Sequence, residues 1–207
     1  MSLSSRFFAA IYDRALAGTE KAGLAAHRKS LLSNAAGRVI EIGAGTGANL
    51  PFYSDAVSDL VVCEPAEPMA RRLERKLATL GRPVRVVRAP AENLPVDSAS
   101  FDVAVSTLVL CTVGDPQRSL AELYRVLKPN GRLLFIEHVR AEEPRLAHWQ
   151  DRLNFLNKCI AQGCNCNRNT VVEIATAGFT VTSLNRDRLR KAPPTVRPLV
   201  VGVAVRP

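Results

Sequence analysis

The sequence predicts an α/β protein whose parallel sheet is covered by helices on both faces. Short apolar runs alternate with helical stretches, and the runs at residues 39–42 and 60–64 are apolar enough for strands buried on both faces. A glycine-rich turn directly follows the first run, as it does where α/β proteins bind a nucleoside-containing ligand. At 207 residues, 47% of them apolar, the chain suits one domain with a substantial core.

The individual elements follow from the spacing of apolar residues and from the glycines and prolines between them. Strands are expected at residues 39–42, 60–64, 84–87, 100–106, 133–136, 179–184 and 199–205. Helices are expected at residues 5–17, 20–33, 46–51, 67–80, 116–127 and 170–177. The first two helices, separated at Gly18, could form a lid over the ligand, a dimer surface or a membrane-surface helix, and we favour the lid because the glycine turn follows so soon. Residues 140–168 are polar, and we expect them to add specificity for a substrate to the scaffold.

The glycine turn is the expected ligand site. Gly43, Gly45 and Gly47 remove three Cβ atoms where the backbone turns and a ligand approaches it. The helix expected after the turn would direct its free N–H groups toward that ligand. With Ala48, the turn also matches the G-x-G-x-x-A fingerprint of dinucleotide sites. Glu41 favours a cationic amine or a ribose instead, since a pyrophosphate has little use for a negative charge so close.

Glu64 is the second candidate for ligand contact. It ends the second predicted strand, 21 positions after Gly43, where a carboxylate can accept hydrogen bonds from both hydroxyls of a ribose. The alternative is a helix-capping acid, because Pro65 and Pro68 mark a helix start nearby. Spacing and position at the strand end together favour the ribose contact.

The formal charge of +9 comes largely from arginine. Two basic clusters contribute most of it: Arg71, Arg72, Arg75, Lys76, Arg82, Arg85 and Arg88, and then Arg186, Arg188, Arg190, Lys191 and Arg197. We interpret them as a solvated helix face and a basic tail. No recognisable nucleic-acid-binding module accompanies them, so nucleic acid is not the expected partner.

The cysteines and the hydropathy pattern indicate the class of protein. Cys63 and Cys111 lie in apolar runs and are expected to be buried thiols. The total of five cysteines, without a secretion signal, argues against a disulfide framework. Cys164 and Cys166 lack the further ligands of a zinc site, so no metal is expected. No stretch reaches the roughly 18 apolar residues of a membrane span, and we expect a cytoplasmic protein.

Four blocks of the sequence, in order, resemble the class I S-adenosylmethionine-dependent methyltransferases. They are residues 41–47, Glu64, residues 91–95 with 100–102, and residues 125–131. The resemblance covers about residues 38–138 and argues against a nicotinamide or flavin enzyme. It implies a Rossmann-like fold with a seven-stranded, mostly parallel sheet, and S-adenosyl-L-methionine as the cofactor. The whole chain, 1–207, would be one domain: a lid at 1–34, a cofactor-binding core at 35–138 and a substrate side at 139–207.

The resemblance also implies which residues hold the cofactor. They are Glu41, Gly43, Gly45, Gly47, Asn49, Glu64, Ala91, Glu92, Ser106 and Thr107. Many members of the class have an acid at the position of Pro90, where it meets the adenine amino group. Because proline cannot do so, we expect Glu92 or a backbone carbonyl to replace it.

A narrower resemblance extends into the C-terminal half. Residues 107–113, 135–139 and 163–165, followed by Arg168 and Thr170, resemble the methyltransferase-like protein 7 group. That resemblance implies methylation of alkyl thiols. Animal members of the group carry a hydrophobic N-terminal anchor that this sequence lacks, so a membrane span is not carried over, while peripheral membrane contact stays open. The ubiquinone and menaquinone C-methyltransferases are also similar, though less so beyond residue 138.

The candidate catalytic residues are His138, Arg168 and Tyr12. A thiol acceptor reacts as the thiolate, and a free thiol has a pKa of about 8.5, so a base or cation near the acceptor would help. His138 would be the base or orient the thiol, although it could instead bond the backbone. Glu137 beside it could brace a helix terminus. Arg168 could hold a substrate carboxylate or tie residues 140–168 to the core.

The sequence therefore predicts a methyltransferase that transfers a methyl group to a small molecule, most simply an alkyl thiol. Direct transfer needs no covalent protein intermediate, so Cys164 and Cys166 are interpreted as loop thiols. The alternatives are a carbon, oxygen or nitrogen acceptor, such as a quinone precursor or lipid headgroup, and a cofactor-binding protein without turnover. Methylation of nucleic acid rests on charge alone and would require salt-sensitive binding. The sequence makes no prediction of the oligomeric state.

Overall fold

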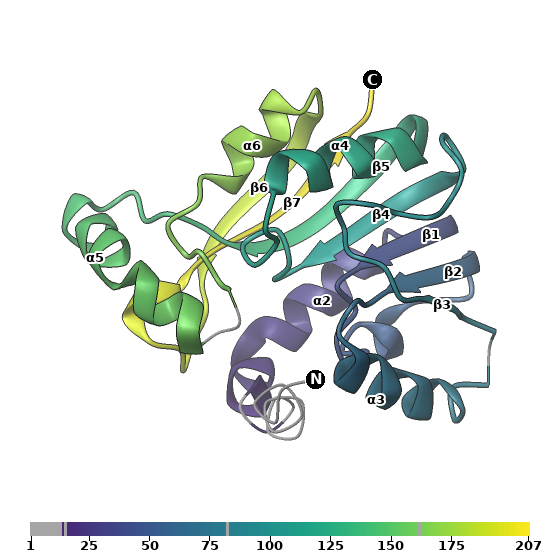
Figure 1. The fold of residues 1–207 in the computed structure, drawn as a ribbon, viewed down its shortest axis with the longest axis horizontal. Coiled ribbons are helices and arrows are strands. Elements are labelled where there is room, and N and C mark those ends of the chain that lie inside the picture. The colour runs from purple at the N-terminus through teal and green to yellow at the C-terminus, as the bar shows by residue number, and fades with distance from the viewer. Residues whose placement is uncertain (1–13, 15, 82, 161–162) are drawn as a thin grey trace.

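The structure, a computed structural model, describes residues 14, 16–81, 83–160 and 163–207. Its centre is a seven-stranded sheet in the order β3-β2-β1-β4-β5-β7-β6 (Figure 1). Strand β7 is antiparallel to both neighbours, and the other strand pairs are parallel. The strands are β1 (Gly37–Ile42), β2 (Val57–Cys63), β3 (Arg85–Val87), β4 (Phe101–Thr107), β5 (Leu127–His138), β6 (Thr180–Arg188) and β7 (Pro198–Val205). The predicted mostly parallel sheet is confirmed.

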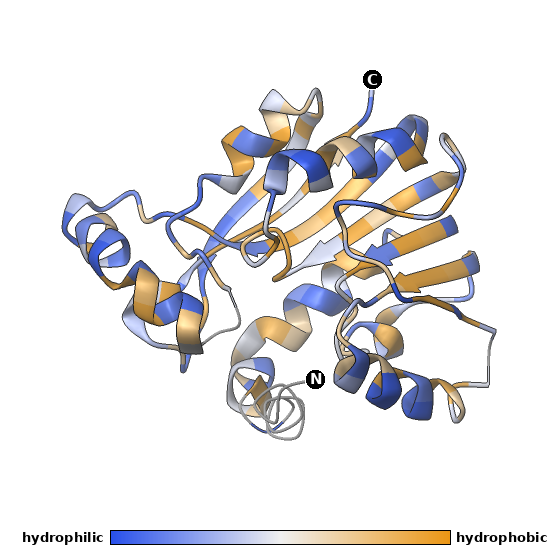
Figure 2. Ribbon diagram, in the orientation of Figure 1, coloured by the Kyte–Doolittle hydropathy of each residue, from blue (hydrophilic) through white to orange (hydrophobic). Residues whose placement is uncertain are grey.

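Helices cover both faces of this sheet, as expected. They are η1 (Glu20–Leu24), α2 (Ala25–Leu32), η2 (Leu50–Phe52), α3 (Glu67–Leu77), α4 (Pro116–Val126), α5 (Pro144–Ile160), α6 (Thr170–Thr176) and η3 (Pro194–Val196). The central strands are mostly hydrophobic, whereas the edge strand β6 and helix α3 are largely hydrophilic (Figure 2). Helices α4 and α6 pack on one face of the sheet, and helices α2 and α3 on the other.

Strand β1 separates two hydrophobic clusters. Ile40 and Ile42 belong to the cluster that includes α4 and α6, and Val39 belongs to the cluster that includes α2 and α3. Because successive side chains of a strand point to opposite faces, Glu41 lies on the same face as Val39. The acid that precedes the glycine turn therefore faces the N-terminal helices.

The helix expected at residues 46–51 is absent, which corrects the sequence prediction. Turns follow strand β1, and only the short 3-10 helix η2 forms before β2. Gly47 has a φ of +82°, which no right-handed helix contains. The backbone N–H groups near the ligand site are therefore those of consecutive turns rather than of a helix N-terminus.

The N-terminal prediction also needs correction. The chain is helical at Gly18, and the interruption lies at Gly23, where φ is 142° inside the π-helical turn η1. Glycine is the residue best able to adopt that angle. Most of the predicted helix 5–17, with the candidate Tyr12, lies outside the described residues.

The substrate-side segment contains a helix that the sequence pattern did not indicate. Helix α5 has 17 residues, of which Ala147 and Gln150 are buried. Trp149, Phe155 and Leu156 are exposed on the same helix. Apolar residues on the solvent side and a buried glutamine conceal the usual helical pattern. Among the described residues, no helix is both long and apolar enough to cross a bilayer.

The contact between the glycine turn and the loop after β4 gives a stability prediction. A Cβ atom at Gly43, where φ is +56°, would lie 2.5 and 2.7 Å from the two methyl carbons of Val109. Gly43→Ala should therefore lower the free energy of unfolding by about 2–4 kcal/mol, from the left-handed backbone and the overlap together. Urea denaturation measures this. Adding Val109→Ala relieves the overlap only, so the double variant should lose less than the sum of the two single losses, and additive losses would contradict the contact.

Candidate cofactor site

Glu64 and the glycine turn lie together at the ends of β2 and β1. One oxygen of Glu64, Oε2, accepts a hydrogen bond of 2.8 Å from the amide of Gly45. The other, Oε1, accepts one of 2.8 Å from the amide of Ala66. Burial raises the pKa of Glu64, although both amides lower it. The acid predicted to bind a ribose is thus held directly against the turn predicted to receive the ligand.

Gly45 shows that the turn has room for a ligand. Its φ is +57°, and a Cβ atom there would meet nothing nearer than the Gly43 carbonyl oxygen, 4.0 Å away. The residue is half-buried, and its amide donates to the carboxylate of Glu64. A bare backbone, open space and an acceptor at the next strand end fit an adenosine-containing cofactor.

Glu41 is buried below the turn in a polar network. Its Oε1 accepts a hydrogen bond of 2.9 Å from Asn49 Nδ2, and its Oε2 accepts one of 2.7 Å from the hydroxyl of Tyr53. Burial raises the pKa of Glu41, while these two donors and the charge of Arg28 lower it. Glu41 and Asn49, both predicted cofactor residues, are therefore in contact, and Asn49 orients the acid.

Thr107 and Arg28 complete the network. Asn49 Nδ2 also donates to Thr107 Oγ1 at 2.9 Å. Arg28 Nη1 donates to Asn49 Oδ1 at 2.7 Å and to Thr107 Oγ1 at 3.0 Å. Arg28 comes from helix α2, so the N-terminal segment contributes directly to this end of the sheet.

Arg28 and Tyr53 were not predicted from the sequence. Arg28 had one detectable signal, since it lies four residues after Leu24 and three before Leu31, on the apolar side of its helix. A charged residue on that side is unusual enough to suggest a buried partner. Tyr53 follows a proline-containing turn and carried no comparable signal.

Glu137 organises the loop that follows β4. Its Oε1 accepts hydrogen bonds from the hydroxyl of Ser106 at 2.7 Å and from the amides of Val109 and Leu110, each at 3.1 Å. Its Oε2 accepts one of 3.2 Å from the amide of Cys111. Burial raises the pKa of Glu137, although all these donors lower it. Glu137 therefore braces a loop, rather than the helix terminus that was considered from the sequence. The hydroxyl of Ser106 donates to Glu137 and is thus used within the protein.

Ala91 and Glu92 lie in the loop after β3. Ala91 is buried in the cluster that includes α4. Glu92 Oε1 accepts hydrogen bonds of 2.9 and 3.2 Å from the amides of Gly114 and Asp115, and its carbonyl oxygen accepts one of 3.0 Å from Arg118 Nε. One carboxylate oxygen of Glu92 therefore holds the start of α4. Its contact with adenine stays a prediction.

His138 lies at the end of β5 but is poorly suited to accept a proton. The side chain is buried, and its Nδ1 has no hydrogen-bond partner among the described residues. Burial lowers its pKa to about 4, against the opposite effect of hydrogen bonds to the backbone of Val196 and Pro198. A base this weak captures the proton of an ordinary thiol inefficiently. The catalytic role of His138 stays a prediction that its environment does not favour.

Arg168 ties the substrate-side segment to the loop after β4. Its Nη1 donates to the Leu110 carbonyl at 2.5 Å, and its Nη2 donates to the Val113 carbonyl at 2.8 Å. This geometry matches the tethering alternative. A hold on a substrate carboxylate stays a prediction.

Cys63 and Cys111 follow the expectation for buried thiols, whereas Cys159 is exposed. Cys63 and Cys111 are buried and free. Cys164 and Cys166 are also buried and form a small cluster with Cys111. Among the described residues, no group of three or more histidine, cysteine, aspartate or glutamate side chains could hold a metal ion.

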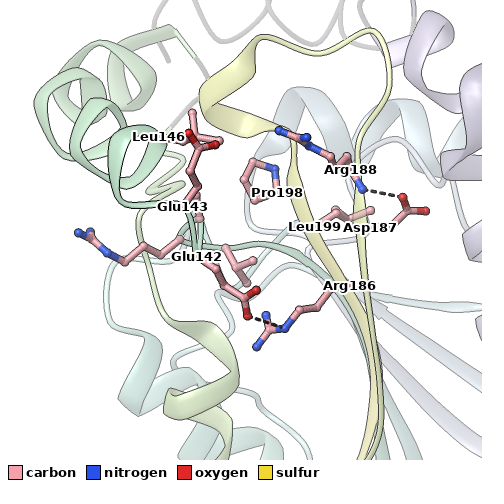
Figure 3. Close-up of a pocket in the computed structure, with 11 residues that line it drawn as sticks. Glu142, Glu143, Leu146, Arg186, Asp187, Arg188, Pro198 and Leu199 are labelled. Carbon is pink, nitrogen blue, oxygen red and sulfur yellow. Dashed lines mark hydrogen bonds and ion pairs between the residues drawn. The ribbon is translucent and has the colours of Figure 1, made fainter.

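A separate hollow of about 230 Å³ lies between β6, the start of β7 and the N-terminal end of α5 (Figure 3). Its walls include the Glu142–Arg186 ion pair, whose closest atoms are 3.0 Å apart. Asp187 and Arg188 also line it. None of the residues predicted to hold the cofactor lines this hollow, and its charged walls do not suit an apolar acceptor.

The sheet order, the open glycine turn and the acid directly after β2 are those of a class I S-adenosylmethionine-dependent methyltransferase. Residues 40–135 match the family model described as a methyltransferase domain. A SAM-dependent methyltransferase from Thermotoga maritima has the same fold, with a TM-score of 0.73, 24% identity, and coverage of 98% of this chain and 97% of that one.

Similar sequences narrow the family. Human thiol S-methyltransferase TMT1A is 35% identical over 173 residues, which cover 81% of this chain and 70% of TMT1A. A phosphatidylethanolamine N-methyltransferase from Cereibacter sphaeroides is 33% identical over 113 residues, 54% of this chain and 55% of that protein. The chain belongs to the methyltransferase family that includes TMT1A, and S-adenosyl-L-methionine is its cofactor.

The Glu64 contacts lead to a binding prediction. In Glu64→Gln, one carboxylate oxygen becomes an amide NH2 group that cannot accept from a backbone N–H or from a ribose hydroxyl. Affinity for S-adenosylhomocysteine should fall about tenfold to a hundredfold, which corresponds to about 1–3 kcal/mol for a hydrogen bond to a charged group. Isothermal titration calorimetry measures the loss. Glu74→Gln, a partly exposed acid on α3 that pairs with Arg88 away from the glycine turn, is the matched control, and equal affinities in both variants would contradict the ribose contact.

The buried ring of His138 predicts a pH effect on stability. Its pKa is about 4 in the folded protein against an ordinary value of 6.5, so the unfolded chain binds more protons between these values. The stability that the neutral ring contributes is therefore present above pH 6.5 and is lost as the pH falls. Between pH 7 and pH 5, the wild type should lose about 2 kcal/mol more than His138→Gln in urea denaturation. Parallel losses would mean that the ring is not buried and neutral.

Proposed function

We propose that this methyltransferase transfers the methyl group of its cofactor to small apolar thiols. The observation that carries the proposal is the extent of the match to TMT1A, a thiol S-methyltransferase. The match covers 81% of this chain, so it must include part of the substrate side, residues 139–207. The match to the N-methyltransferase covers 54% of the chain and gives less support for its acceptor.

The residues at the ends of β1 and β2 would hold the cofactor. Glu64 offers acceptors for the ribose, and the open side of Gly45 allows the adenosine to approach the backbone. Glu41 would balance the positive charge of the amino-acid end from its buried position. When bound, the cofactor supplies a methyl group on an activated sulfonium, which a thiolate can accept directly.

The contribution of the chain is then alignment of the acceptor and exclusion of water. Positioning alone can lower a barrier by about 7–11 kcal/mol for well-aligned groups. The loop after β4 is suited to this task, because Glu137 and Arg168 fix its amides and carbonyls. The N-terminal segment, residues 1–34, would act as the lid above it.

The thiolate itself would come from the acceptor rather than from a strong base of the protein. His138 is neutral at pH 7 and too weakly basic to hold the thiol proton. The proton of the thiol would therefore pass to solvent, and the rate would follow the fraction of acceptor that is already a thiolate. The net positive charge of +9 favours the approach of such an anion.

A second candidate is methylation of a lipid headgroup amine. The match to the phosphatidylethanolamine N-methyltransferase supports it, since the alignment to that protein covers 54% of this chain. An amine acceptor reacts in its neutral form, which needs a base for the ammonium proton. The net charge of +9 favours the approach of a thiolate over that of an ammonium. The cytoplasmic location expected from the sequence stays a prediction.

The acceptor is tested with tritium-labelled S-adenosylmethionine and three classes of acceptor: an alkyl thiol, a quinol and vesicles that contain phosphatidylethanolamine. We expect transfer to the thiol at least tenfold faster than to the others. The thiol rate should rise with pH up to the acceptor pKa of about 8.5, and His138→Gln should keep this profile. Preferred transfer to the quinol or the lipid would overturn the thiol proposal. A pH profile that His138→Gln alters would restore the histidine as a base.

A further inference from the structure

Arg28 is a buried cation to which the proposed methyl transfer assigns no contact with cofactor or acceptor. Its side chain is 4% exposed, and it reaches from helix α2 to the end of β4. A buried guanidinium is costly to keep unless anionic and polar partners surround it. Asn49 and Thr107 supply polar oxygens on one side. The groups that neutralise the guanidinium of Arg28 therefore indicate which ligand atoms this end of the site can bind.

Glu20 is the carboxylate that contacts Arg28. Its Oε1 lies 3.1 Å from both Nε and Nη2 of the arginine. Glu20 belongs to the π-helical turn η1, directly before the break at Gly23, and its side chain is 23% exposed. A partly exposed carboxylate on an irregular turn can reach water if another anion takes its position.

The polar partners of Arg28 connect it to the cofactor residues. Asn49 donates to Glu41, and Thr107 ends β4 beside the loop that packs on Gly43. S-adenosylmethionine carries one carboxylate, at its amino-acid end. A guanidinium presents a planar fork of donors that matches a carboxylate better than any other side chain does.

We propose that Arg28 binds the α-carboxylate of the cofactor, and that the carboxylate of Glu20 competes with it for the guanidinium. This inference rests on the turn around Gly45 and Glu64 as the cofactor site. The exchange replaces one carboxylate by another, so the buried positive charge stays neutralised in both states. It also makes the N-terminal segment sense the amino-acid end of the ligand, because Arg28 and Glu20 both belong to that segment.

Calorimetry with a pair of ligands tests the proposal. S-adenosylmethionine and its decarboxylated form differ by the carboxylate alone, and both keep the sulfonium and the amine. In Arg28→Met, which keeps the bulk and removes the charge, affinity for S-adenosylmethionine should fall about tenfold to a hundredfold. Affinity for the decarboxylated ligand should stay within about threefold or improve. A merely structural arginine would lower both affinities by the same factor, and that result overturns the proposal, as does an unchanged affinity for both.

Glu20→Gln provides an independent variant if Arg28→Met does not fold. Removing the competing carboxylate should strengthen S-adenosylmethionine binding about threefold to tenfold and leave the decarboxylated ligand unchanged. Equal changes for both ligands, or no change, would overturn the exchange. If the wild type binds neither ligand, the cofactor site itself is overturned. If the wild type binds both ligands and the variants change both affinities by the same factor, only the role of Arg28 is overturned.

Discussion

The buried carboxylate of Glu137 is the contact on which the geometry of the site depends. It accepts from the hydroxyl of Ser106 and from three successive backbone amides of residues 109–111. Three amides that point to one acceptor fix the path of a loop more firmly than packing alone. Val109 is thereby held against Gly43, where there is no room for a side chain. The glycine turn thus depends on an acid that lies two strands away in the sheet.

The substrate-side segment donates hydrogen bonds to the backbone carbonyls of the same loop. Arg168 binds the carbonyls of Leu110 and Val113, and the amide of Asn165 binds the carbonyl of Cys111. The amides of residues 109–111 are therefore satisfied by β5, and the carbonyls of Leu110, Cys111 and Val113 by residues 165–168. The loop after β4 therefore contacts both residues 163–168 of the substrate-side segment and Gly43 of the glycine turn.

The sequence predicted those parts of the site that spacing alone determines. Glu64 and the turn at residues 43–47 could be predicted because each directly follows a short apolar run that reads as a strand. The helix at 46–51 was wrong because Gly47 takes a left-handed conformation that a glycine permits but does not require. Arg28 and helix α5 were missed because their partners are remote in sequence, and helix α5 carries its large apolar residues on the exposed side.

Electrostatics explains why three buried acids at one sheet edge have different uses. Burial raises the pKa of Glu41, Glu64 and Glu137 alike, so each stays charged only where donors surround it. Glu137 is saturated by donors from its own chain and can only be structural. Glu64 takes two amides at a half-open turn and can still accept from a ligand. Glu41 is stabilised in its charged form by Tyr53, by Asn49 and by the charge of Arg28, so the N-terminal segment contributes to the charge below the turn.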